Sequence, residues 1–242
     1  MAKQIRLDKY LSDMGMGTRS EVKIAIKKGL VKVNNQVIKT PDYKVSMSDL
    51  VSCHDEPLIY KEYEYYMLNK PAGVVSATED KKDKTVIELL ADKKRKDLFP
   101  VGRLDKDTEG LLLLTNDGEL AHQLLSPNKR VGKLYFAKVE GKVTSREVEL
   151  FLAGLKVDEE FTAMPATLKV LSSGSESEVE LMIMEGKFHQ VKRMFEAVGM
   201  KVLYLKRLSM GSLRLDDMLK PGEYRLLTDE ELERLKKEHG RG

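Results

Sequence analysis

An uneven distribution of charge constrains this chain most, because it separates a short basic segment from a longer, slightly acidic remainder. The 242 residues carry 42 Lys and Arg against 39 Asp and Glu, which gives a formal net charge of +3. Residues 1–40 hold nine of the bases and three of the acids and are therefore +6, whereas the other 33 bases and 36 acids leave the remainder at −3. This asymmetry predicts that one part meets a polyanion while the other does different work, although a solvated basic helix would give the same pattern.

The composition is that of a globular chain without a membrane segment. Hydrophobic residues make up 41% and charged residues 33%, which is typical of a packed domain rather than a disordered one. The apolar block Leu111–Leu114 is far shorter than the roughly 20 residues that cross a bilayer. The first residues lack the apolar core of a secretory signal, and a single cysteine, Cys53, excludes an internal disulfide. We therefore expect a cytoplasmic protein with one large core and a small appended unit.

A capped basic helix is predicted near the N-terminus. Residues 18–21, Thr-Arg-Ser-Glu, have the form of a capping box, in which the Thr hydroxyl and the Glu carboxylate each accept from the other residue's backbone amide. The helix should begin near Arg19 and end before Gly29, which suits the left-handed conformation beyond a helix end. Arg19, Lys23 and Lys27 fall four residues apart, so they should form a row of cations on one face.

The residues after this helix complete a small module. Residues 30–33 and 36–38, joined by two asparagines, predict a short hairpin because asparagine tolerates positive φ. With an amphipathic turn upstream, residues 4–50 resemble the alpha-L RNA-binding module found in a ribosomal protein and in several RNA-modifying enzymes. The resemblance implies that the row of three cations neutralises RNA phosphates with little preference for sequence.

The remainder predicts a larger domain in which strands outnumber crossover helices. A polar, acidic stretch at residues 49–57 marks the boundary, so the predicted domains are 1–59 and 60–242. The expected fold class is α+β, with a mixed, mainly antiparallel sheet and flanking helices, two of which begin at further capping boxes, at Thr144 and Thr228. Strand patterns lie at residues 65–68, 111–115, 135–139, 167–171, 177–183 and 202–207, and helical patterns at 86–90, 118–125, 145–153, 189–198 and 229–238.

Three charged motifs in the larger domain carry the chemical signal. Residues 69–73 present Lys70 at a rigid turn after a strand, although an ordinary turn has the same sequence. Residues 102–118 join a charged loop to an apolar strand, and a solvated acidic loop would explain that motif alone. Residues 185–195 enter a helix with cations three and four residues apart, which an ordinary basic helix surface would also show.

No motif supports a metal site. Asp105, Asp107 and Gly110 occupy the first, third and sixth places of a calcium loop, but Asn116 stands where the loop needs a bidentate glutamate. The four histidines are scattered, and the one cysteine lies in the predicted linker without an activating neighbourhood. We therefore expect no metal.

Taken together and in this order, the motifs resemble the bacterial pseudouridine synthases of the RsuA family. Within the family, the forms at residues 67–71 and 189–195 look most like the enzyme that modifies small-subunit (16S) ribosomal RNA. The family breaks the bond from uridine N1 to the ribose, turns the base and rejoins it through C5, so the resemblance implies an isomerase without an organic cofactor. The matching segments span nearly the whole chain, at residues 70–73, 102–105, 108–111, 186–195 and 221–228.

The resemblance also implies catalytic roles for three residues. Asp105 corresponds to the catalytic carboxylate, which acts as a nucleophile at C1′ or as a base that takes the C2′ proton, and the sequence does not choose between the two. Lys192 corresponds to the cation that pairs with this carboxylate and keeps it ionised, where many relatives have arginine. Tyr135 corresponds to the aromatic residue that stacks on the target base, although a core tyrosine in a strand would look the same.

RNA contacts are expected from Arg103, Lys70, His189 and Arg193, in addition to the N-terminal row of cations. Arg103 corresponds to a side chain that fills the space left by a flipped base, and a phosphate contact is the alternative. The cations should cluster around the catalytic acid, with many of the compensating acids on other faces. The expected partner is 16S ribosomal RNA or a small-subunit assembly intermediate, and the expected state is a monomer. Two alternatives are a large-subunit (23S) RNA target and a non-catalytic ribosome-assembly factor.

Overall fold

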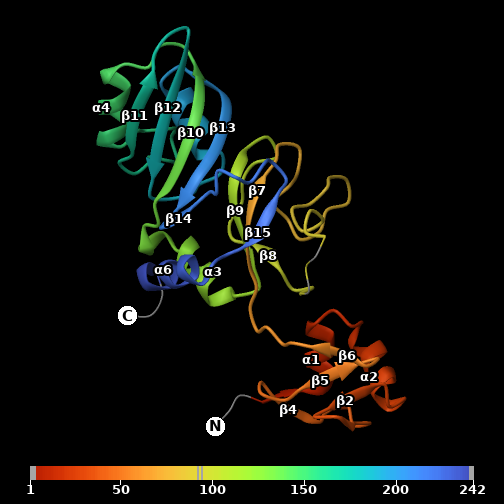
Figure 1. Cartoon of the computed structure of the whole chain (residues 1–242). Coiled ribbons are helices and arrows are strands. Elements are labelled where there is room, and N and C mark those ends of the chain that lie inside the picture. The colour runs from red at the N-terminus through yellow and green to blue at the C-terminus, as the bar shows by residue number, and fades with distance from the viewer. Residues whose placement is uncertain (1–3, 92, 94, 240–242) are drawn as a thin grey trace. The chain divides into compact units, whose positions relative to one another are not determined.

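The computed structural model describes residues 4–91, 93 and 95–239, and the chain divides into two compact units. The larger unit contains residues 65–90 and 99–242, and the smaller contains residues 1–64 and 91–98 (Figure 1). The change of unit after residue 64 lies close to the predicted boundary at residue 59. Residues 91–98 belong to the smaller unit, although they lie inside the predicted larger domain.

The smaller unit packs two helices on small antiparallel sheets. The predicted capping box is confirmed, because the Thr18 hydroxyl accepts from the Glu21 amide and the Glu21 carboxylate accepts from the Thr18 amide. Asn34 and Asn35 turn the predicted hairpin at φ 50° and 66°. Its elements are β1 (Gln4–Arg6), α1 (Leu7–Asp13), α2 (Arg19–Lys27), β2 (Val31–Val33), β3 (Gln36–Val37), β4 (Lys44–Ser46), β5 (Val51–Cys53) and β6 (Glu56–Leu58).

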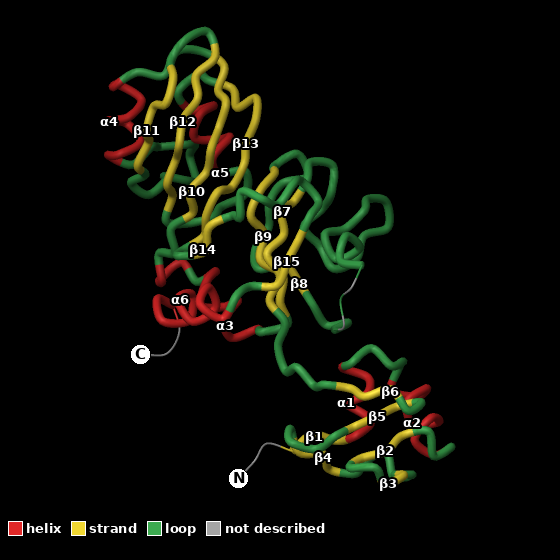
Figure 2. The backbone as a smooth tube through the Cα atoms, in the orientation of Figure 1, coloured by secondary structure: helices red, strands yellow, loops and turns green. Residues whose placement is uncertain are grey.

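The core of the smaller unit lies between α1, α2 and the strands. Leu7 and Leu11 from α1 meet Ile26 from α2 and Val31 from β2, and each is almost fully buried. Strand order β3-β2-β5-β6 forms one sheet, and β1 pairs with β4 (Figure 2). Because α2 buries only its apolar face, its cationic residues are left exposed.

The larger unit contains a mixed sheet in the order β11-β12-β10-β13-β9-β7-β15, with β14 on β13 and β8 on β9. Only β9 and β13 run parallel among the described pairs, so the predicted α+β class with a mainly antiparallel sheet is confirmed. The strands are β7 (Tyr65–Lys70), β8 (Phe99–Pro100), β9 (Glu109–Thr115), β10 (Lys133–Glu140), β11 (Thr167–Ser172), β12 (Glu176–Ile183), β13 (Lys201–Met210), β14 (Leu213–Arg214) and β15 (Tyr224–Leu226). The helices are α3 (Gly118–Leu125), the 3₁₀ helix η1 (Pro127–Lys129), α4 (Ser145–Ala153), α5 (Gln190–Ala197) and α6 (Asp229–His239).

The parallel contact between β9 and β13 joins the two halves of this sheet, and it requires a glycine. Gly110 has φ +101°, and a Cβ atom there would overlap the backbone carbonyl oxygen of Arg207. The next four residues of β9, Leu111–Leu114, are all fully buried, as expected of a central strand covered on both faces. The backbone of β13 can therefore approach β9 directly beside the charged loop that precedes β9.

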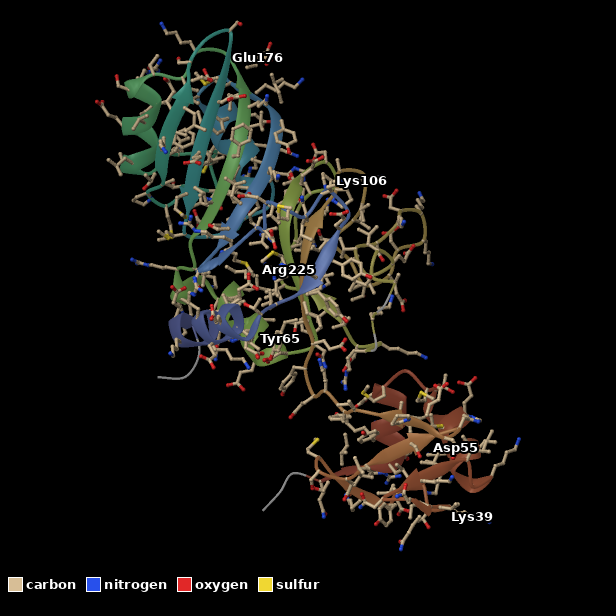
Figure 3. The ribbon with its side chains drawn as sticks, in the orientation of Figure 1. Lys39, Asp55, Tyr65, Lys106, Glu176 and Arg225 are labelled. Atoms are coloured by element: carbon tan, nitrogen blue, oxygen red, sulfur yellow. The ribbon has the colours of Figure 1, made fainter. Side chains whose placement is uncertain are left out.

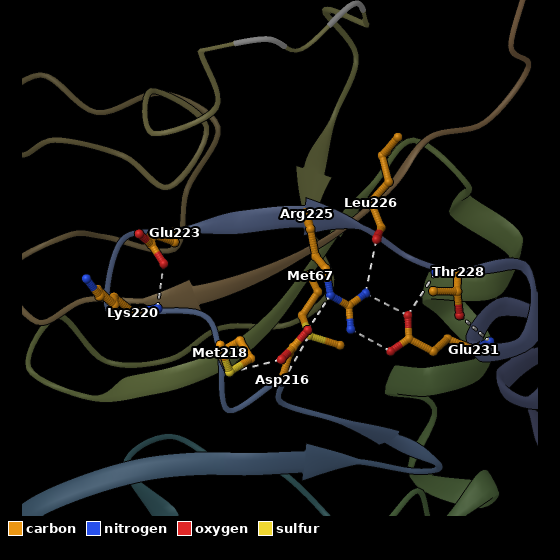
Figure 4. A network of polar contacts seen from close by, with 9 residues as sticks. All are labelled: Met67, Asp216, Met218, Lys220, Glu223, Arg225, Leu226, Thr228 and Glu231. Atoms are coloured by element: carbon orange, nitrogen blue, oxygen red, sulfur yellow. Dashed lines mark hydrogen bonds and ion pairs between the residues drawn. The ribbon is translucent and has the colours of Figure 1, made fainter.

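A network of ion pairs and hydrogen bonds connects β15, α6 and the segment before β15 in the larger unit (Figure 4). Arg225 on β15 donates from Nε to Asp216 at 2.7 Å and makes two bonds of 2.8 Å to the Glu231 carboxylate. Glu231 also accepts from the backbone amide of Thr228, which completes the predicted capping box at the start of α6. This motif therefore anchors α6 and β15, and none of these side chains lines the cavity described below.

The predicted helix at residues 86–90 is wrong, because this segment consists of turns. Thr85 and Glu88 exchange the hydrogen bonds of a capping box, so the local signal for a helix start is present. The backbone departs from a helical path after one turn, because so short a run gains too few backbone hydrogen bonds to continue as a helix. Val86 and Leu90 are nevertheless buried. Across the described residues, none of the helices has the length and apolar character needed to cross a membrane.

Candidate active site

One buried lysine, Lys70, holds the loop that carries Asp105 through hydrogen bonds to its backbone carbonyl groups. Lys70, the last residue of β7, has a side chain with 0% exposure. Its Nζ donates to the carbonyl oxygens of Thr108 at 2.8 Å, Asp105 at 3.0 Å and Lys106 at 3.3 Å, and to its neighbour Pro71 at 3.0 Å. Burial lowers the pKa of Lys70 to about 8, although the nearby acids of the loop act in the opposite direction. A group without exposed surface does not reach RNA, so the predicted RNA contact at Lys70 is corrected to a positioning role for the loop.

Further contacts fix the same loop on its other sides. The Ser76 hydroxyl donates to the Leu104 carbonyl at 2.9 Å and accepts from the Leu104 amide at 3.1 Å. The Lys106 side chain, labelled in Figure 3, turns outward to Asp83 with an Nζ to Oδ1 distance of 2.6 Å. The backbone on both sides of Asp105 is therefore held before any substrate arrives, which is the condition for precise positioning of a catalytic group.

The Asp105 carboxylate faces two groups from the third sequence motif. Its Oδ2 lies 3.1 Å from Lys192 Nζ, and its Oδ1 lies 3.5 Å from His189 Nε2. Lys192 also contacts Asp107 at 2.6 Å, a partner that the sequence reasoning missed. Burial alone would lower the pKa of Lys192, but the bonds to the two carboxylates outweigh burial and raise it. Lys192 therefore places a positive charge directly beside the Asp105 carboxylate.

A cavity of about 290 Å³ opens beside Asp105. The Tyr135 side chain, 7% exposed, lies on its floor, and Ile183 and Leu205 from neighbouring strands add apolar surface. The charged lining residues comprise four cations, Arg103, Lys133, Lys187 and Arg207, and two acids, Asp105 and Glu185. The cavity therefore combines a carboxylate, an aromatic ring and an excess of positive charge, a set that fits an anionic substrate with a flat apolar part.

Half of the site residues predicted from sequence come together around this cavity. Asp105, Tyr135, Arg103 and His189 line it, and Lys192 contacts Asp105 directly. His189 adopts a left-handed backbone conformation at the start of α5, and its ring stacks on the Phe188 ring with 3.7 Å between centroids. The helix and the loop, far apart in sequence, therefore present their side chains to one space.

The remaining predicted cations lie elsewhere. Arg193 forms an ion pair with Asp158, and its guanidinium lies over the Phe161 ring at 5.2 Å from the centroid, so it does not line the cavity. The three cations of the N-terminal row lie on α2 of the smaller unit and are exposed. Lys23 lies 4.0 Å from the Asp8 carboxylate, and this is a loose contact that leaves its charge in solvent.

Three further polar residues on the cavity floor were missed by the sequence reasoning. They are Lys133, Arg207 and Thr108, with 7%, 2% and 1% exposure. A signal for Lys133 exists, because it precedes Tyr135 by two residues and strand side chains two apart share a face. Arg207 lies two residues after Leu205 on β13, and both side chains line the cavity. Within the described part of the chain, no group of three or more His, Cys, Asp or Glu side chains is placed to hold a metal ion.

Comparison with family models matches two segments of the chain. Residues 64–197 match the model described as RNA pseudouridylate synthase, and residues 5–51 match the S4 domain. The first match covers more than half of the chain and contains Asp105, Tyr135 and Lys192. The second contains α2 and its exposed cations.

Relatives align over nearly their full length. An uncharacterized RNA pseudouridine synthase of Bacillus subtilis is 46% identical, with 94% of this chain and 97% of the relative covered. The ribosomal small subunit pseudouridine synthase A of Vibrio cholerae is 40% identical over 94% and 98% of the two chains. The ribosomal large subunit pseudouridine synthase B of Bacillus subtilis is 38% identical over 98% of both. A crystal structure of a pseudouridylate synthase superposes with a TM-score of 0.67 at 37% identity, covering 96% of this chain and 99% of the other.

Proposed function

This chain belongs to the RNA pseudouridylate synthase family, isomerases that act on RNA, and we propose that it converts one uridine of small-subunit (16S) ribosomal RNA to pseudouridine. The observation that carries this proposal is the Asp105 carboxylate, held between Lys192 and His189 at the edge of a cavity floored by Tyr135. A carboxylate can act as the nucleophile or the base that breaks a bond between a base and a sugar, and an aromatic ring can hold the base meanwhile.

In the proposed reaction the uridine leaves the RNA stack and its base enters the cavity, at a cost of a few kcal/mol. Asp105 then attacks C1′ or removes the C2′ proton, and the electron pair of the N1–C1′ bond departs with the base. The base turns on Tyr135 and C5 bonds to C1′. In the first route this displaces the Asp105 oxygen from C1′, and in the second Asp105 returns its proton to C2′. The C5 proton is then lost while N1 gains one. Reactant and product are isomers, so the balance needs no other reactant.

The choice of small-subunit RNA is supported by the motif at residues 186–195, several of which line the cavity. Residues 186–195 contain the Phe188–His189 stack, and Phe188 is 66% exposed, which leaves its ring accessible to an incoming nucleotide. These residues and 67–71 carry the resemblance to the 16S enzyme. Large-subunit RNA is the second candidate, because a relative of similar identity carries that name.

The smaller unit is proposed to deliver ribosomal RNA, either naked or within an assembling small subunit. Its S4 match and the exposed cations of α2 support this role. We further propose that the protein acts as a monomer in the cytoplasm. A non-catalytic assembly factor would not need Asp105 and Lys192 at 3.1 Å, so we favour the enzyme.

Mapping of pseudouridine tests the proposal directly. Ribosomal RNA from cells with and without the gene is compared at every uridine, and we expect one 16S position to lose its pseudouridine and to regain it with the wild-type gene. If the pseudouridine that disappears lies in 23S RNA instead, the substrate of this enzyme is large-subunit RNA. No lost position in either RNA, together with no activity of the purified protein on both, would contradict the proposed function.

A further inference from the structure

The floor of the cavity holds a guanidinium nitrogen that its surroundings leave unpaired. Arg207 is 2% exposed, and its Nε donates to the Leu111 carbonyl at 2.8 Å. Its Nη2 is buried and has no hydrogen-bond partner among the residues that the structure describes, yet the residue lines the cavity. An unpaired buried donor costs about 1–3 kcal/mol, and more when it is charged. Such a group is retained where a ligand completes it.

A second unpaired group and a second cation lie on the same floor. The Thr108 hydroxyl is buried without a hydrogen-bond partner among the described residues, and it also lines the cavity. Lys133 Nζ donates only to the Val131 carbonyl, at 2.9 Å, among the described residues. Burial and the positive charge of Arg207 lower the pKa of Lys133 to about 8, against the opposing effect of Glu185. Two mutually repelling cations in a buried recess favour a ligand that carries negative charge.

The strands place these groups beside the base-stacking tyrosine. Tyr135 on β10 pairs directly with Arg207 on β13, and neighbours across an antiparallel pair share a face of the sheet. Lys133 lies two residues before Tyr135 and therefore points to the same face. Thr108 directly precedes β9, which runs parallel to β13 at Glu109 and Lys206. A base that lies against the Tyr135 ring consequently directs its edge toward the Arg207 recess, which consists of Arg207, Lys133 and Thr108.

The chemistry of the proposed reaction supplies a negative charge at that edge. When the N1–C1′ bond breaks, its electron pair stays on N1, and conjugation spreads the charge over the O2 and O4 carbonyl oxygens of the uracil. C1′ meanwhile bonds to an Asp105 oxygen, or the sugar loses its C2′ proton to Asp105. Donors that meet charge only as it develops lower the barrier more than donors that bind the neutral substrate.

We propose that the Arg207 recess receives a carbonyl oxygen of the flipped uracil and stabilises the base as an anion between bond cleavage and reattachment. The inference rests on the proposed function and adds residues that act on the leaving base rather than on the sugar. A phosphate is the other oxygen-bearing group of RNA. It fits less well, because the members of the recess are at most 7% exposed and line the same cavity as the Tyr135 ring.

The test measures loss of the target nucleoside in a single turnover, with a short RNA that carries the mapped uridine. Arg207→Met and Lys133→Met should each lower the rate about 100-fold, the loss typical of one missing oxyanion donor. Arg207→Lys should retain more of the rate than Arg207→Met does. The Kd of each variant for the RNA should stay within about twofold of the wild-type value. Lys206→Met and Lys138→Met are matched controls, since Lys206 lies outside the cavity lining and Lys138 pairs with Glu178 at the surface.

A modified substrate separates this role from a structural one. With 5-fluorouridine at the target position the fluorine itself stabilises the uracil anion, so the deficits of both methionine variants should shrink several-fold. Equal deficits on both substrates would overturn the proposal, and so would weaker RNA binding with an unchanged cleavage rate, the result expected of a phosphate contact. If Arg207→Met fails to fold by circular dichroism, Lys133→Met and Arg207→Lys decide the question. A wild-type protein without activity would contradict the proposed function instead.

Discussion

The exposed cations of the smaller unit and the buried cations of the larger one share a charge but differ in what they bind. Arg19, Lys23 and Lys27 stand in solvent on α2, whereas Lys70 and Arg207 are 0% and 2% exposed and donate to backbone carbonyl oxygens. Exposed charges act at a distance, are screened by salt and substitute for one another. Buried charges act through fixed hydrogen bonds, and each is tied to one geometry. Burial, rather than the sign of the charge, therefore separates cations that attract RNA from cations that organise chemistry.

The strongest test of the buried region is removal of its central carboxylate. Asp105→Asn keeps the size of the side chain but offers neither a nucleophile nor a base, so turnover should fall roughly a thousandfold or more while RNA binding persists. Single-turnover formation of pseudouridine is the measurement. Asp107→Asn is the matched comparison, because Asp107 also bonds Lys192 but its side chain is 73% exposed. It should keep at least about a tenth of the rate, and similar losses in the two variants would contradict the assignment of Asp105.

Removal of the lysine under the loop should produce the next largest effect. Lys70→Met fills the same space but leaves the carbonyl oxygens of Asp105, Lys106 and Thr108 without their donor. We expect the free energy of unfolding to fall by about 2 kcal/mol and the rate of pseudouridine formation to fall about 100-fold through misplacement of Asp105. Denaturant titration and single-turnover kinetics measure the two.

The RNA affinity of this variant distinguishes positioning from binding. Lys70 has no exposed surface, so the Kd for RNA should change less than about twofold. A large loss of affinity with normal kinetics of the bound complex would show that Lys70 contacts RNA after all.

The contrast between the two regions also explains what the sequence could predict. The cap at Thr18, the asparagine turn and the exposed row on α2 depend on residues within a few positions, and local spacing was sufficient for each. The role of Lys70 depends on carbonyls 35 to 38 residues away, and Lys192 meets Asp107 across 85 residues. For Asp105 and Lys192 the family resemblance supplied the long-range pairing. For Arg207 nothing did, because its place opposite Tyr135 depends on the register between β10 and β13, which is irregular next to this pair.

A pH profile sharpens the comparison, because burial lowers the pKa of two lysines of the larger unit, Lys70 and Lys133, to about 8. Burial and the neighbouring Arg207 lower the pKa of Lys133 to about 8, so the protonated form that the recess requires is lost as the pH rises through 8. The rate of the cleavage step should therefore fall as the pH rises through this value, toward tenfold per pH unit for each lysine that must stay protonated. Lys70 has a pKa of the same value and contributes to the same fall. Lys133→Met should remove the part due to Lys133 and leave a shallower profile, and an unchanged profile would exclude Lys133 from the reaction.

The exposed row should respond to substitution in the opposite manner, with a smaller and graded effect. Changing Arg19, Lys23 and Lys27 to Gln should raise the Kd for RNA several-fold at low salt and lower the slope of log K against log salt by about two, since each lost phosphate contact removes about 0.7 from that slope for single-stranded RNA. The rate of the bound complex and the free energy of unfolding should not change, because these side chains are exposed and outside the cavity. Lys138→Gln with Lys169→Gln is the control, since both lysines are surface residues of the larger unit paired with glutamates. If the control lowers the salt slope as much as the triple variant does, surface lysines of the larger unit bind RNA phosphates as well as the α2 cations do. That result would contradict the proposed RNA-binding role of the smaller unit.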